Sequence, residues 1–341
     1  MILSFPPDHP GYRIGRVVVH SAVRFAKTSA REGSPIDQKK RVIVALVLNQ
    51  ILSSGTHLFA KATLTAIGPL ATALLRFICA SVTLLLFELL RPRRERVAWK
   101  DIPKLIWLGF LVVPANQGLY LFGLSQSTPS HAAFLYALTP LVVFLLARRF
   151  LDEGGARAKL IGIAAAFAGV ALILVDRGLA REAQVLRGDM LILLAVFSWA
   201  AYTIGSKRLL ERYDPMTVTT WVIVGGTALC LPAILIPGTI PPLRSIGLPA
   251  WGGLAYLTIG TSVVAYPLWL YALRRLEASK VAITTNAQPV LTSVLSWFLF
   301  QEKFGPAFFA GAALILIGVS WVEIQKGTGA AMRARAVGQT R

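Results

Sequence analysis

Charged residues are scarce in this sequence, and cysteine is scarcer still. Asp, Glu, Lys and Arg together make up 15% of the 341 residues, against about 25% in typical soluble domains. Hydrophobic residues reach 55%, above the soluble average of about 45 to 50%. This balance argues against a soluble fold and favours an integral membrane protein. The two cysteines, Cys79 and Cys230, lie in apolar runs, which predicts buried free thiols and no disulfide framework.

Motifs that mark catalytic centres are missing as well. The sequence has no GxxxxGK[ST] phosphate loop, no HExxH, no Gly-x-Ser-x-Gly elbow and no cysteine pair with metal-ligand spacing. Of the four histidines, His9 and His20 lie near the N-terminus, and only His57 and His131 fall where a membrane cavity could be. We therefore expect no catalytic residue, no metal and no cofactor. A membrane-embedded enzyme remains a remote alternative.

Positive charge is abundant by contrast, with a net charge of +19. The basic residues form no stripe interleaved with aromatic residues, so nucleic acid is not the expected partner. They lie between the apolar runs, as they do in membrane proteins that orient by the positive-inside rule. The expected partner is the lipid bilayer.

Apolar runs of about 20 residues recur from Arg41 onward. This is the length that about 30 Å of hydrocarbon requires at 1.5 Å per helical residue. The runs are continuously apolar and do not alternate with period two, which favours helices over a barrel. We predict an all-α integral membrane protein with ten transmembrane helices, at residues 42–62, 70–90, 105–125, 131–150, 159–176, 188–207, 217–236, 250–272, 279–300 and 305–324.

The connections between these runs give the orientation. Sixteen Lys and Arg lie in alternate connections on one side, and six lie in the connections on the other. The richer side is expected to be cytoplasmic. Both termini then lie in the cytoplasm, as a disordered basic tail at residues 1–40 and a second tail at 326–341.

Residues 130–170 recur at residues 279–319 with a constant offset of 149. The match includes Pro140 with Pro289, Glu153 with Glu302, Gly162 with Gly311 and Gly169 with Gly318. Towards the front of each half, Lys61 matches Lys207 at an offset of 146. One supersecondary unit is therefore used twice, as a five-helix repeat at 41–176 and another at 188–325.

The odd number of helices per repeat inverts the second copy in the membrane. Inverted repeats are common in secondary transporters, whose substrate site lies near the bilayer midplane between the halves. We therefore expect a central cavity between the two halves. The small residues of spans 159–176 and 305–324 are expected to let helices pack closely. We do not expect these two spans to line the transport path.

Ionisable groups are almost absent from the middle of the predicted spans. Glu88, Asp189 and Glu323 fall near span ends, where we expect them to be solvated, and Arg76 is expected to reach the outer interface through its long stem. The centre then offers no buried cation for a phosphate. A largely neutral cavity suits a substrate without net charge.

Polar uncharged and aromatic residues are more informative, because such groups are costly against lipid and must pair with other helices or line a wet cavity. His57 in particular is either a neutral interface histidine or a cavity residue. The candidate substrate-binding residues are Asn49, Ser53, His57, Asn116, Gln117, Tyr120, Tyr136, Trp199, Tyr202, Tyr266, Trp269, Asn286 and Gln288. Four prolines inside spans are candidate hinges, or static kinks that widen the cavity: Pro114, Pro140, Pro267 and Pro289.

Ten spans, the repeated proline, the glutamate that follows it and the paired glycines resemble the drug/metabolite transporter superfamily, and more narrowly the EamA-type exporters of bacteria. The resemblance covers residues 42–325 and is strongest in FLDEGGARAKLIGIAAAFAGV and FLFQEKFGPAFFAGAALILIGV. The family pattern Leu-x-Glu reads Leu-Asp-Glu at Leu151 and Phe-Gln-Glu at Phe300. Within the superfamily the chain is most similar to aromatic amino acid exporters.

The resemblance implies export of small metabolites across the bacterial inner membrane by alternating access. Small four-helix relatives that expel cationic drugs use a glutamate in their first span, but residues 41–87 contain no carboxylate here. Aromatic rings could stack on a ring or hold an ammonium. We therefore predict an exporter of amino acids, aromatic ones in particular, with drugs or other hydrophobic metabolites as the alternative substrates.

Two further questions stay open at this point. Proton coupling and facilitated diffusion are equally compatible with the sequence, and His57 is the candidate if protons are used. We expect a monomer or a weak homodimer.

Overall fold

A computed structural model describes residues 35–92, 95–151, 165, 168–169, 172, 183–301 and 304–318. Every regular element among these residues is a helix. The chain divides into residues 1–44 and residues 45–341. Of the first unit only the initial turns of helix α2 are described, and all contacts below lie within the second.

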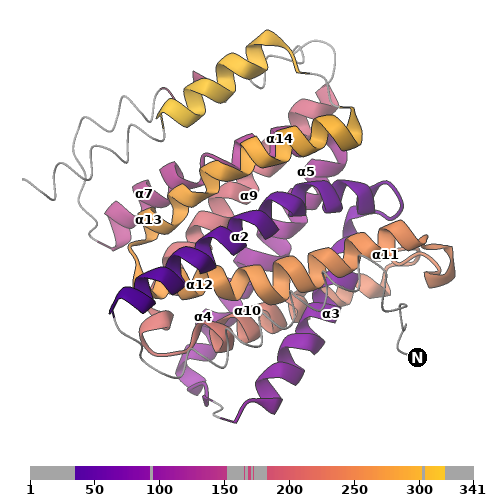
Figure 1. The fold of residues 1–341 in the computed structure, drawn as a ribbon. Helices are drawn as coiled ribbons and strands as arrows, with labels where there is room; N and C mark the ends of the chain where they lie inside the picture. Colours follow the sequence, from indigo (N-terminus) through magenta and orange to yellow (C-terminus); the bar gives the residue numbers. More distant parts are fainter. Residues whose placement is uncertain are drawn as a thin grey trace, which may run out of the picture. The chain divides into compact units, whose positions relative to one another are not determined.

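The helices begin and end close to the predicted runs. Their bounds are α2 Pro35–Leu64, α3 Pro69–Leu90, α4 Ile102–Phe110, α5 Leu119–Gln126, α6 Pro129–Tyr136, α7 Thr139–Phe150, α9 Ala183–Lys207, α10 Pro215–Cys230, α11 Leu248–Ala255, α12 Tyr266–Arg275, α13 Ala278–Ala282 and α14 Ala287–Phe300. Helix α2 begins at Pro35, inside the predicted N-terminal tail. Figure 1 shows α2 between α12 and α14, which hydrogen bonds from Asn49 to Ala265 and from Thr292 to Ser54 support.

Seven helical segments in the described part of the chain are long and apolar enough to cross a membrane. They are Ile36–Leu64, Pro69–Leu90, Trp99–Gln126, Pro129–Phe150, Gln184–Glu211, Pro215–Leu235 and Leu248–Arg275. All seven overlap predicted spans, and Ile36–Leu64 and Trp99–Gln126 each begin six residues before the predicted start. The predicted span 279–300 is divided into α13, a tighter turn at Ile283–Asn286, and α14. Span 305–324 is described as a shorter apolar helix, Pro306–Gly318.

Several predictions fall outside the described residues. These are most of span 159–176, with Gly162, and the repeated glutamates Glu153 and Glu302. Residues 1–34 of the predicted N-terminal tail, the predicted tail at 326–341 and the end of span 305–324, with Glu323, are outside as well. The ten-helix count therefore remains a prediction.

Local breaks in α-helical geometry accompany all four prolines. Pro114 lies within a π-helical segment, Leu111–Gly118, and Pro267 follows a second such segment, Tyr256–Ala265. Pro140 restarts the chain as α7 after a turn at residues 137–138, and Pro289 follows the tight turn before α14. A proline lacks the N–H that the preceding turn needs, so it favours such departures. Whether these breaks act as hinges stays a prediction.

Glycines bring neighbouring helices into backbone contact. A Cβ atom added to Gly226 of α10 would lie 2.3 Å from the carbonyl oxygen of Gly109 in α4, and one added to Gly123 of α5 would lie 2.6 Å from that of Gly188 in α9. Likewise a Cβ at Gly169 would lie 2.5 Å from the carbonyl oxygen of Gly311. Small residues are expected at such membrane helix interfaces. The hydrophobic effect contributes little to helix association in apolar lipid, so close packing has to provide the attraction.

The two cysteines are free thiols, as predicted, but they are not buried. Cys79 is exposed and Cys230 is half-buried. Since apolar positions of a membrane helix can face lipid instead of protein, an apolar run alone does not place a thiol in a protein core.

Candidate functional site

A small cavity of about 60 Å³ lies among the broken helices. A water molecule needs about 10 to 15 Å³ of such volume, so the cavity has room for a few waters and not for an aromatic ring. The lining residues are Asn49, Ser53, Thr56, His57, Asn116, Gln117, Tyr120, Tyr136, Trp199, Thr261, Tyr266, Trp269, Thr285 and Gln288.

Eleven of the thirteen predicted site residues are in this lining. Tyr202 is not, because it is fully buried behind Trp199, with ring centroids 5.2 Å apart. Asn286 is not, because residues 283–286 wind more tightly than an α-helix, and the changed register turns Thr285 towards the cavity instead. Sequence reasoning also missed the hydroxyls of Thr56 and Thr261, since threonine in a membrane helix gives no distinctive signal.

Hydrogen bonds fix the histidine in the wall of the cavity. The hydroxyl of Tyr120 lies 2.9 Å from Nδ1 of His57, and Oε1 of Gln288 lies 3.4 Å from its Nε2. An amide oxygen only accepts, so Nε2 carries a proton, and in the neutral ring Nδ1 then accepts from the tyrosine. Gln288 in turn donates to Oε1 of Gln50 at 2.7 Å. His57 thus has a feature of both alternatives, since it has two hydrogen-bond partners on other helices and also lines the cavity.

Two asparagines make the same contact in opposite directions. Asn49 donates to the carbonyl of Ala265 at 2.8 Å, and Asn116 donates to the carbonyl of Ala195 at 2.7 Å. Ala195 corresponds to Asn49 at the sequence offset of 146, and Ala265 corresponds to Asn116 at the offset of 149. The same two positions of the repeat are therefore joined by a hydrogen bond twice. The donor is the asparagine at one position in the first bond and the asparagine at the other position in the second bond.

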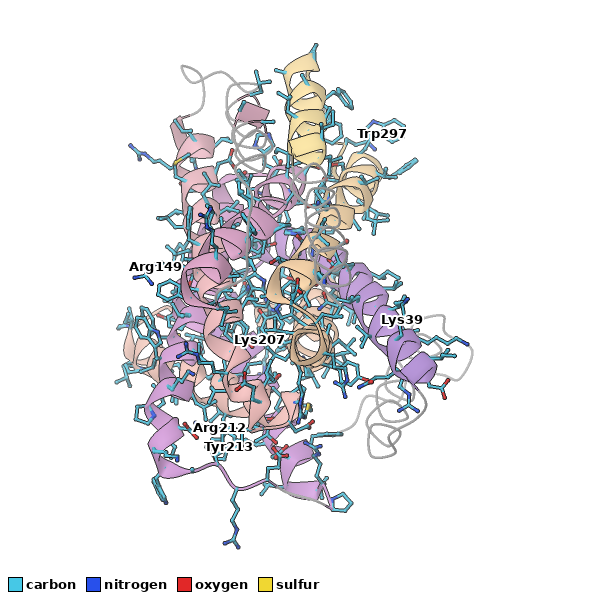
Figure 2. The ribbon with its side chains drawn as sticks, turned by 90° about the vertical axis from the view of Figure 1, so that its left-hand side faces the viewer. Lys39, Arg149, Lys207, Arg212, Tyr213 and Trp297 are labelled. Carbon is cyan, nitrogen blue, oxygen red and sulfur yellow. The ribbon has the colours of Figure 1, made fainter. Side chains whose placement is uncertain are left out.

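Two lysines make a second repeated contact. Lys61 Nζ donates to the carbonyls of Leu124 at 2.9 Å and Ser127 at 2.6 Å, and Lys207 Nζ donates to those of Leu273 and Leu276. Figure 2 labels Lys207.

The acceptors of the two lysines also correspond, since Leu273 and Leu276 lie 149 residues after Leu124 and Ser127. A cation at the last carbonyls of a helix satisfies groups that have no partner within the helix. The repeat found in the sequence is therefore matched by repeated hydrogen bonds.

The side chain of Arg76 lies inside the protein and not at the outer interface, where the sequence predicted it. It is fully buried, and it donates from Nε to Oγ of Ser262 at 3.0 Å and from Nη1 to Oε1 of Gln117 at 2.7 Å. The expectation that it reaches the outer interface is wrong, because two partners far away in the sequence hold it inside. The expectation of a centre without a buried cation is wrong for the same reason.

Two carboxylates near span ends are also buried. Asp189 accepts from Nδ1 of His131 at 2.8 Å and from the hydroxyl of Ser127. Glu88 accepts from the hydroxyl of Thr217 at 2.9 Å. The expectation that both are solvated is wrong, since each has partners on neighbouring helices.

Alanine in place of Asp189 is expected to lower the free energy of unfolding by about 3 kcal/mol. The change leaves His131 and Ser127 buried without their acceptor, and breaking one side of a buried pair costs about 3 to 5 kcal/mol. Reversible unfolding of the purified protein in mixed detergent micelles measures the difference. Glu277→Ala is the matched control, because its pair with Lys280 is exposed at 53% and 55% and should contribute less than about 1 kcal/mol. Equal losses in both variants would contradict the structural role of Asp189.

The profile of the EamA-like transporter family matches residues 40–175 and again residues 186–324. The chain belongs to the EamA-like transporter family. Two successive matches cover most of the sequence, and the family consists of transporters, which fits a protein that is not an enzyme.

Relatives of this EamA-family chain are mostly transporters without an assigned substrate. The uncharacterized transporter YyaM of Bacillus subtilis (strain 168) is 26% identical over 281 residues, 82% of this chain and 92% of its own length. An uncharacterized transporter of Archaeoglobus fulgidus is 30% identical over 284 residues, 80% of this chain and 94% of its own length.

One relative has a named substrate class. A probable terminal-alkyne amino-acid exporter of Streptantibioticus cattleyicolor is 28% identical over 284 residues, 83% of this chain and 93% of its own length. A solved crystal structure with 20% identity matches at a TM-score of 0.62, over 84% of this chain and 97% of that one, and shows a shared fold. This EamA-family chain is therefore a multi-pass membrane transporter of small molecules.

Proposed function

We propose that this chain exports amino acids, aromatic ones in particular, from the cytoplasm across the bacterial inner membrane. The observation that carries the proposal is a cavity with two kinds of wall. Trp199 packs against Tyr266 and Trp269, with ring centroids 5.3 and 5.6 Å apart, while amides and hydroxyls line the rest. Aromatic rings suit an aromatic side chain, and the polar wall suits a zwitterion. The amino-acid exporter of Streptantibioticus cattleyicolor supports the same substrate class.

Alternating access between two inverted five-helix halves is the proposed mechanism. The repeated asparagine and lysine contacts support a pseudo-symmetric pair of halves. Since a cavity of about 60 Å³ is too small for an aromatic amino acid, the helices have to move apart for a substrate to enter. The breaks at the four prolines offer the hinges for that motion. The orientation with both termini in the cytoplasm belongs to the same proposal.

Coupling is proposed at His57. Its two nitrogens contact Tyr120 and Gln288 in the cavity wall, so a proton taken up there would change both hydrogen bonds. Facilitated diffusion is the alternative, and it predicts flux that does not respond to a pH gradient.

Flux into proteoliposomes tests the proposal. Labelled phenylalanine, labelled threonine and a fluorescent cationic dye are compared, each with and without a pH gradient. We expect saturable phenylalanine flux that exceeds threonine flux. Dye flux without flux of either amino acid would favour the export of drugs or hydrophobic metabolites and contradict the proposed substrate.

A further inference from the structure

We propose that Arg76 binds the carboxylate of the substrate. This inference rests on the proposed function, because it identifies the residue that binds the carboxylate of the transported amino acid. Arg76 contacts Gln117 in the cavity wall. The substrate class it implies is an organic monocarboxylate with an apolar side chain.

The first argument is the incomplete pairing of the guanidinium. Arg76 is 0% exposed, and its Nε and Nη1 are occupied by Ser262 and Gln117. Its Nη2 is buried and has no hydrogen-bond partner among the described residues. An unsatisfied nitrogen on a buried cation is costly. An acceptor from outside the chain would remove that cost.

The second argument is the missing counterion. No ion pair among the described residues involves Arg76. The buried carboxylates of Glu88 and Asp189 are held by other partners, Thr217 and Arg91 for the first and Ser127 and His131 for the second. A charged residue within the membrane that lacks an internal counterion points to a functional site.

The third argument is a set of neighbouring donors without acceptors. The hydroxyl of Tyr266 and Nε1 of Trp269 are buried, line the cavity and have no partner among the described residues. These two residues are three apart in α12 and so share a face. The Tyr266 phenol also lies close enough to the Arg76 guanidinium for an electrostatic interaction and a weak hydrogen bond, although the two groups do not meet the geometric criteria for a full hydrogen bond.

If the Tyr266 oxygen accepts from Arg76, its own proton still lacks an acceptor. Arg76 Nη2, the Tyr266 hydroxyl and Trp269 Nε1 together therefore offer more donors than acceptors. A carboxylate brings two oxygens with about four acceptor sites and can accept from a guanidinium with both oxygens.

A chain of amides orients the cation. Gln117 accepts from Arg76 and donates to Oδ1 of Asn116 at 2.6 Å, and Asn116 donates to the hydroxyl of Tyr136 at 2.8 Å. Gln117, Asn116 and Tyr136 all line the cavity. The guanidinium is therefore held against residues of the cavity wall, and it can contact a carboxylate once the helices move apart to admit the substrate.

Competition against labelled phenylalanine flux tests this assignment. The competitors are unlabelled phenylalanine, 3-phenylpropanoate, which keeps the ring and the carboxylate but lacks the amino group, and phenylalanine amide, which lacks the carboxylate. In the unchanged protein the amide is expected to compete about tenfold or more weakly than phenylalanine, because it loses at least one charge-assisted hydrogen bond. In Arg76→Gln this preference should disappear, whereas Arg149→Gln, at an exposed arginine of α7 (Figure 2), should keep it. An undiminished preference in Arg76→Gln would overturn the proposal.

Thermal unfolding of the purified protein separates this inference from the proposed function. We expect 3-phenylpropanoate to raise the unfolding temperature of the unchanged protein and of Arg76→Lys, which keeps the charge, and not of Arg76→Gln. Stabilisation without any amino acid flux would retain the carboxylate site and reject the exporter. Amino acid flux without stabilisation by the carboxylate, or with equal stabilisation by 3-phenylpropanol, would overturn the carboxylate site and retain the exporter.

Discussion

Alanine at both Tyr266 and Trp269 is expected to reduce saturable phenylalanine flux about hundredfold per folded molecule. With Trp199 these residues form the aromatic wall of the cavity. Truncating a well-packed aromatic contact at a binding site costs about 2 kcal/mol or more. The losses of binding free energy at neighbouring residues are not additive, so we expect about 3 kcal/mol for the pair. This loss corresponds to a decrease in flux of about hundredfold. Trp199→Ala, Tyr266→Ala and Trp269→Ala should each show part of this loss.

The matched control for the aromatic wall is Trp297→Ala. Trp297 in α14 is 55% exposed and points away from the neighbouring helices (Figure 2). Its removal should leave phenylalanine flux within about twofold. Because a large buried side chain also contributes to stability, flux is normalised to monodisperse protein. Unchanged flux in all three single variants would exclude this wall from the substrate site.

Leucine at Gly226 is expected to prevent accumulation of folded protein. A Cβ at this position would lie 2.3 Å from the carbonyl oxygen of Gly109 and 2.7 Å from the side chain of Val113. The nearest atom belongs to the backbone, so α4 and α10 would have to move apart. Overpacking alone costs about 1 to 3 kcal/mol, and separating two membrane helices adds the loss of their close contact. Size-exclusion chromatography of the solubilised protein measures the monodisperse fraction.

Gly252→Leu provides the control for that substitution. Gly252 in α11 has no atom within 4 Å of an added Cβ. The same change should therefore leave the monodisperse fraction near that of the unchanged protein. Comparable losses at Gly226 and Gly252 would show that the contact between α4 and α10 is not the cause.

Much of this architecture could be predicted from hydropathy and residue type. Apolar runs predicted the seven long helices, since a bilayer imposes a minimum length on each crossing. Amides and aromatic residues in those runs predicted most of the cavity lining, since few other environments tolerate them. Neither inference required knowledge of how the helices are arranged.

Partners distant in sequence could not be predicted. Arg76 is held by Ser262, 186 residues away, and Asp189 by His131, 58 residues away. A sequence shows that such a group lies in an apolar run, but not which way it points around the helix axis. Deviations from α-helical winding add a second limit, since the tight turn at 283–286 presents Thr285 to the cavity in place of Asn286. Both limits concern rotation about a helix axis, which hydropathy does not encode.

Counterflow tests the central claim, transport of an amino acid through this cavity, most directly. Proteoliposomes loaded with unlabelled phenylalanine are diluted into a trace of labelled phenylalanine. A carrier that alternates between two states should accumulate label transiently above the equilibrium level, and the variant with alanine at Tyr266 and Trp269 should not. Label that only equilibrates, or counterflow that persists unchanged in that variant, would contradict transport through this site.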